Sequence, residues 1–122
     1  TITDPQPSLV FITSNYYCSN FVSTPIPRPA FNTQTPTEQQ RAEAYNGFIA
    51  VAGPYERKGT TLVIHPAVSI EPDLMDGGSL ELEYRLEGDR LTLIMNPARI
   101  KYRNMEYRPN YTEGRYTLRR LE

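Results

Sequence analysis

The sequence predicts a mainly β fold: an antiparallel up-and-down β-barrel of about seven or eight strands with one α-helix at about residues 36–51. Three observations lead to this class. β-rich runs separated by turn signals recur along the chain, residues 79–95 alternate like a hairpin, and residues 35–38 read TPTE, a helix start. Short connections between neighbouring strands favour a meander that closes on itself, since closure removes exposed strand edges.

The hairpin at residues 79–95 is the clearest element. Gly88-Asp89 fits a type II′ turn, which has glycine at its first central position. Folding around this turn places Tyr84 opposite Leu93 and leaves Arg85 on the other side. One face is apolar and the other is charged, as in a half-buried antiparallel sheet.

Outside that hairpin, runs rich in β-branched and aromatic residues predict further strands. Ser14-Asn15 is expected to form one connecting turn and Lys58-Gly59 another. Interruptions are expected at Pro66 and at Asn96-Pro97, because proline cannot donate to a sheet ladder. The predicted segments are 8–13, 16–22, 55–57, 60–65, 67–70, 99–107 and 115–121.

Alternation also assigns faces to the strands around Lys58-Gly59. This turn places Tyr55 opposite Leu62. It leaves Leu62 and Ile64 on one face of the sheet and His65 on the other.

The helix prediction rests on its two ends. Thr35 is the expected N-cap, Pro36 the first helical residue and Glu38 the partner that completes a capping box. Gly53 is the expected stop. The apolar stripe, which should cover the sheet or the barrel mouth, consists of Ala42, Tyr45, Ile49 and Ala52.

Length and charge narrow the function classes. A chain of 122 residues is expected to form a single domain, 1–122. Lys and Arg total 13 and Asp and Glu total 14, so the net charge is -1. A nucleic-acid or anionic membrane surface needs a basic excess, so we expect neither as a partner.

Cysteine and histidine are too few for the common metal and disulfide arrangements. Cys18 is alone, which excludes an intrachain disulfide and a thiolate metal site, and His65 is the only histidine. We expect no metal and no cofactor. The sequence has neither a long apolar span nor a signal-peptide pattern, and with its single thiol this predicts a cytoplasmic protein.

Several motifs occur in a characteristic order. The first hairpin is followed by a helix end that leads into Gly53 to Tyr55, a strand with His65, a loop with Ser69 and Pro72, and R-x-x-x-G-D-x-L-x-L from Arg85 to Leu93. This order resembles the lipocalin-like domain family, which are small calycin-type β-barrels. The resemblance covers about residues 8–121 and implies the same barrel fold.

One departure from that family bears on assembly. Its members usually open with a strand carrying G-x-W-x-L, whereas this chain has no tryptophan. Without such a strand, residues 8–13 would form an edge with apolar side chains on both faces. Such edges attract other strands, so we expect a homodimer with residues 1–13 at or near the interface.

The sequence favours the binding of a small, largely apolar or aromatic molecule in a barrel cavity. Barrels of about eight strands have room for one small ligand. Tyrosines, nine in this chain, combine an apolar ring with a polar tip. The expected ligand-binding residues are Phe11, Ile12, Tyr17, Tyr55, His65, Leu82, Tyr84, Leu93, Met95 and Tyr116.

Three alternatives remain open on the same residues. The first is a filled barrel without any cavity, acting as a structural or interaction module. The second is a cofactor-free enzyme of secondary metabolism, a cyclase or isomerase, in which His65 or a tyrosine polarises a carbonyl. The third treats His65 as a hydrogen-bonded wall residue. Binding is favoured over catalysis, because no residue set defines a reaction.

Overall fold

The fold is mainly β, as predicted, and the described residues form eight antiparallel strands and a single α-helix. The structure is a computed structural model that describes residues 7–24, 27–103 and 114–121. The elements in chain order are β1 (Ser8–Ile12), β2 (Tyr16–Val22), α1 (Glu38–Asn46), β3 (Phe48–Lys58), β4 (Thr61–Ile64), β5 (Val68–Ser69), a 3₁₀ turn η1 (Pro72–Leu74), β6 (Ser79–Glu87), β7 (Arg90–Lys101) and β8 (Gly114–Arg119).

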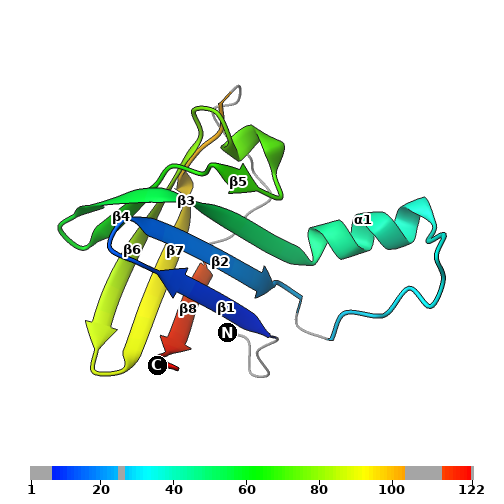
Figure 1. Cartoon of the computed structure of the whole chain (residues 1–122), viewed down its shortest axis with the longest axis horizontal. Coiled ribbons are helices and arrows are strands. Elements are labelled where there is room, and N and C mark those ends of the chain that lie inside the picture. The colour runs from blue at the N-terminus through cyan, green and yellow to red at the C-terminus, as the bar shows by residue number, and fades with distance from the viewer. Residues whose placement is uncertain (1–6, 25–26, 104–113, 122) are drawn as a thin grey trace.

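The strands form one curled sheet in the order β1-β2-β3-β4-β6-β7-β8, with β5 added beside β3. The order follows the chain, so the up-and-down topology is confirmed. The sheet folds over on itself as a half-barrel (Figure 1). Within the described residues, the path ends at β1 and at β8 without joining them.

The core lies inside this curl, on what we call the concave face. Tyr17 and Val51 from one part of the sheet belong to the same buried cluster as Ile64 and Leu93 from the other. The rings of Phe21 on β2 and Tyr116 on β8 also meet across the interior, with centroids 4.8 Å apart. The opposite side of the sheet is the convex face.

The β6–β7 hairpin has the predicted register. Tyr84 pairs with Leu93, and Arg85 lies exposed on the other face. Gly88, the first central residue of the turn, has a φ of 60°, whereas the φ of Asp89, the second, is negative. A positive φ at the first central residue alone is the type II′ pattern. The turn residues and the apolar face therefore specify the same register.

The turn between β3 and β4 lies one residue later than predicted. Lys58 pairs with Thr61, so Gly59-Thr60 is the turn, and Tyr55 pairs with Ile64 rather than Leu62. The predicted pairing was wrong because glycine takes the first central position of the turn, as it does at Gly88. The shift of a partner by two positions preserves the predicted faces.

The helix is shorter than predicted and does not pack. α1 spans Glu38–Asn46, its capping box is formed by Thr37 and Gln40, and its C-cap is Gly47. It has no buried residue and projects away from the sheet (Figure 1). The predicted stripe was wrong, because Ile49 and Ala52 belong to β3.

β7 is longer than predicted and absorbs part of a separate predicted strand. The strand continues through Asn96-Pro97 to Lys101, with a register shift against β6 between Leu80 and Leu82. Ala98 donates its backbone N–H to the Asn96 side chain, which fixes the irregular step. The end of the predicted strand 99–107 lies outside the described residues.

Candidate functional site

The concave face carries its side chains in rows that cross the strands. One row joins Tyr84, Leu93 and Tyr116, which are register partners on β6, β7 and β8. A second row lies nearer the hairpin turn. We call it the leucine row, and it consists of Leu86, Leu91 and Leu118.

These rows differ sharply in exposure. Leu93 is 1% exposed, whereas Leu86 is 68% exposed and Leu91 and Leu118 are half-buried. In Figure 1 the tip of the β6–β7 hairpin and the end of β8 project past β1. The concave face is therefore packed at its centre and open at the hairpin end.

Most of the predicted ligand-binding residues lie on the concave face, but several are enclosed in the core. Tyr17, Leu82 and Leu93 are 2%, 4% and 1% exposed, and they belong to the central cluster. Their role in the structure is packing. The predicted residues that retain some exposure on this face are Ile12, Tyr55, Tyr84, Met95 and Tyr116.

Phe11 and His65 lie on the convex face. Phe11 pairs with Cys18, which alternates with the core residue Tyr17, and it is 61% exposed. His65 follows the core residue Ile64 and is also exposed. A single concave cavity cannot include these two side chains, and the enzyme hypothesis loses His65 as an interior group.

The tyrosine hydroxyls of the concave face differ in availability. Tyr84 and Tyr55 donate to the backbone carbonyls of Gly59 and Thr13, at 3.1 and 2.7 Å. Burial raises the pKa of Tyr17 to about 12, partly offset by a hydrogen bond with Ser19, and burial also raises the pKa of Tyr116. Tyr116 thus stays protonated at neutral pH, and its hydroxyl makes no hydrogen bond to any described residue.

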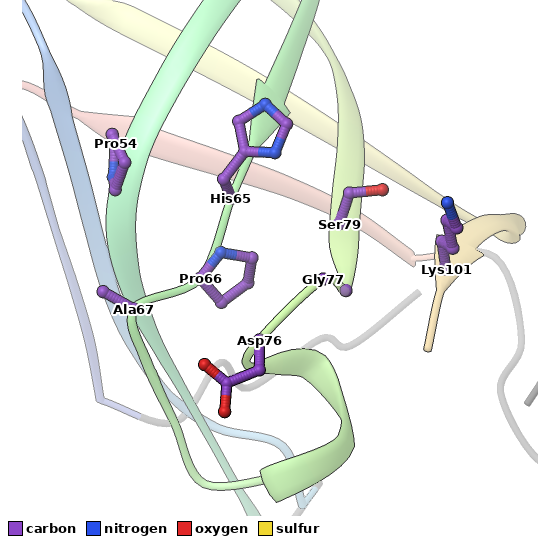
Figure 2. Close-up of a pocket in the computed structure, with 9 residues that line it drawn as sticks. Pro54, His65, Pro66, Ala67, Asp76, Gly77, Ser79 and Lys101 are labelled. Atoms are coloured by element: carbon purple, nitrogen blue, oxygen red, sulfur yellow. The ribbon is translucent and has the colours of Figure 1, made fainter. Parts of the chain in front are cut away.

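A shallow groove lies on the convex face, beside the middle of β3 and next to the end of β4, the start of β6 and the end of β7. His65 donates its backbone N–H to the Pro54 carbonyl, and the β4–β6 register ends at the pair Ile64 and Leu80, so His65 and Ser79 are the residues directly beyond that pair. Ser79 in turn pairs with Lys101. The groove has a volume of about 370 Å³ and is lined by Pro54, His65, Pro66, Ala67, Asp76, Gly77, Gly78, Ser79 and Lys101 (Figure 2).

The acidic groups at the groove already have partners. Glu56 Oε1 lies 3.0 Å from His65 Nε2, and Asp76 Oδ2 lies 3.4 Å from Arg103 Nη1. Arg103 also lies 3.8 Å from Asp73. By contrast, the side chains of Lys101 and Ser79 make no hydrogen bond or ion pair with any residue that the structure describes.

Sequence reasoning missed this groove, although a signal for it was present. The predicted faces already separated His65 from Leu62 and Ile64. Extending the alternation of β6 backward from Leu80 places Ser79 on the same side as His65. Lys101 could not be placed in that way, because the shift at Asn96-Pro97 changes its partner on β6.

Two further observations concern metals and membranes. Among the described residues, no three His, Cys, Asp or Glu side chains gather closely enough to hold a metal ion. No helix in the described part of the chain is long and apolar enough to cross a bilayer.

Comparisons of the chain with protein-family models, with curated proteins and with solved structures found no match. The resemblance to the lipocalin-like family therefore remains a prediction from motifs. The functional argument rests on this chain's own geometry.

Proposed function

We propose that this protein binds a small, largely apolar molecule on the concave face at the open end of the half-barrel. The observation that supports this most directly is the leucine row, in which Leu86 is 68% exposed on the side of the sheet that elsewhere forms the core. Contiguous apolar surface of this kind is costly in water and marks interaction sites.

The neighbouring row supports a ligand with one polar group. Tyr116 lies beside Leu93 and one row from Leu118, and its hydroxyl is available for hydrogen bonding. Because the phenol stays protonated at neutral pH, it can donate to a ligand carbonyl or ether oxygen. The ligand would thus have an apolar body against the leucine row and an acceptor atom near Tyr116.

A neutral fluorescent probe tests this proposal. N-phenyl-1-naphthylamine should bind the wild-type protein saturably, with increased emission. Leu86→Gln should weaken binding by roughly tenfold or more, because it removes about 1.5–3 kcal/mol of apolar burial. Fluorescence titration of wild type and variant measures the change.

Leu9→Gln is the matched control for this experiment. Leu9 is 50% exposed and lies on the convex face of β1, so this variant should bind the probe like wild type. Equal weakening by both substitutions, or an affinity unchanged by Leu86→Gln, would remove the leucine row as the binding surface.

We also propose that the chain forms a homodimer through the edge of β1. Backbone bonds from Val22 to Pro7 and from Thr13 to Tyr16 fix the ladder between β1 and β2. Since bonded and non-bonded pairs alternate, the N–H and C=O of Val10 point outward from the sheet. Phe11, 61% exposed beside this edge, favours an apolar partner such as a second β1.

Sedimentation of Val10→Pro tests this interface. The wild type should sediment at twice the 14.0 kDa mass of one chain, and Val10→Pro should be monomeric because it removes an outward N–H without affecting β2. Val10→Ala keeps that N–H and should remain dimeric. A wild type that is monomeric at about 100 μM, well above the micromolar range of specific dimers, would contradict the proposal.

A further inference from the structure

The groove on the convex face is separate from the surface proposed above for the apolar ligand. The same strands β4, β6 and β7 separate the two, and alternate residues of each strand face opposite sides. Leu80 and Ile100 point into the core, whereas their neighbours Ser79 and Lys101 line the groove.

The groove has one cationic group without an ionic partner among the described residues. Asp76 and Asp73 share Arg103, and Glu56 is paired with His65. Lys101 is therefore the cation of the groove that is unpaired among the described residues. In Figure 2 the Ser79 hydroxyl points toward the side of the groove where Lys101 lies. An ammonium and a hydroxyl together suit the charge-assisted hydrogen bonds of a carboxylate.

Part of the groove is apolar and rigid. Pro54, Pro66 and Ala67 line it on the side away from Lys101 (Figure 2). The proline rings fix the backbone φ, and Pro54 and Ala67 are held by backbone hydrogen bonds to His65 and Ala52. This surface is suited to a compact ring or a short branched chain, and it needs little ordering when a ligand binds.

We propose that this groove binds a small monocarboxylate with a compact apolar body. The carboxylate lies between the Lys101 ammonium and the Ser79 hydroxyl, and the body lies on Pro54, Pro66 and Ala67. The volume of about 370 Å³ is near the lower end for small-molecule sites, which limits the ligand to about the size of a single substituted ring.

The charges around the groove favour a monoanion over phosphate. One lysine neutralises one negative charge, and the carboxylates of Asp76 and Glu56 lie close by. Phosphate carries more than one negative charge at neutral pH and would meet repulsion from these groups.

Benzoate is the test ligand, and benzyl alcohol is its neutral counterpart. In an amide NMR titration, benzoate should shift the signals of residues 65, 67, 77–79 and 101 saturably. Benzyl alcohol and inorganic phosphate should bind at least about tenfold more weakly, since each loses the match to a single cation.

Two lysine variants separate a specific site from general charge attraction. Lys101→Gln should weaken benzoate binding by roughly tenfold, the effect expected for loss of one charge-assisted hydrogen bond. Lys58→Gln, at the exposed end of β3, should leave it unchanged. Ser79→Ala should cause a smaller loss.

The outcomes that overturn the proposal are distinct. Shifts that do not saturate, equal losses in the two lysine variants, or phosphate binding as tight as benzoate would each exclude a built carboxylate site. Leu86→Gln should bind benzoate like the wild type, because Leu86 lies outside the groove. The carboxylate site and the apolar-ligand site are therefore tested independently, and either proposal can fail without the other.

Discussion

Leu93→Ala should lower the free energy of unfolding by about 2–5 kcal/mol, the cost of a cavity at a fully buried leucine. Leu93 is 1% exposed and lies between its register partners Tyr84 and Tyr116. The surrounding strands are held in hydrogen-bonded ladders, so they cannot collapse readily into the space. Urea unfolding monitored by circular dichroism measures the loss.

Leu86→Ala is the control for that measurement, because Leu86 lies on the same face and hairpin but is 68% exposed. Its effect should stay within about 0.5 kcal/mol, as for most surface positions. Similar losses at the two positions would show that the hairpin does not enter the core as described.

Gly53→Ala should produce the other large loss of stability, at or above the 1–3 kcal/mol that is typical of overpacking. A Cβ on Gly53 would lie 2.3 Å from the His65 carbonyl oxygen and 2.8 Å from the Ala67 nitrogen. Both atoms are backbone, and the chain at Pro66 crosses directly over this position. The clash can be relieved only by moving β3 away from the segment that follows β4.

Gly47→Ala is the control, because it makes the same substitution where the added Cβ meets a side chain that can move. Its new Cβ would meet the end of the Thr24 side chain at 2.9 Å, and that group can rotate away. Thermal unfolding should therefore show a much smaller shift for Gly47→Ala than for Gly53→Ala. The opposite order would mean that the crossing at Gly53 is looser than described.

The parts of the fold that sequence predicted well are those that local pattern determines. The β6–β7 hairpin has a turn residue that must adopt positive φ and an alternation that a one-residue slip would invert. Tyr84, Leu93 and Arg85 therefore took their predicted faces. The same reasoning gave the correct faces for Leu62, Ile64 and His65, even though the turn was misplaced.

The helix boundary was mispredicted because residues 48–52, FIAVA, satisfy two patterns at once. Their spacing continues the apolar stripe of a helix, but their apolar and β-branched side chains also suit a strand. Pairing of this run with β2, from Val22–Phe48 to Cys18–Ala52, decides between the patterns. That contact joins distant parts of the chain, so no local window contains it.

The candidate sites, like the fold, combine features that local pattern determines with features that depend on contacts between distant segments. The inward-facing tyrosines and leucines followed from alternation, but their accessibility depends on how far the sheet curls. The convex groove joins Pro54 of β3, His65 directly after β4, Ser79 of β6 and Lys101 of β7. Its last member depends on the register shift in β7, which only the assembled sheet defines.

The unpacked helix has a consequence for how this scaffold can change. Val22 and Phe48 are cross-strand partners, so residues 23–47 are topologically a single hairpin connection between β2 and β3. Because α1 has no buried residue, the sheet gains little packing energy from the sequence of this helix. The connection touches the sheet near its base, where the Arg28 guanidinium lies over the Phe48 ring of β3. Loop closure costs only about 0.6 kcal/mol for each doubling of length. The connection is thus the place where the chain can lengthen, shorten or accept a grafted peptide while the half-barrel keeps its register.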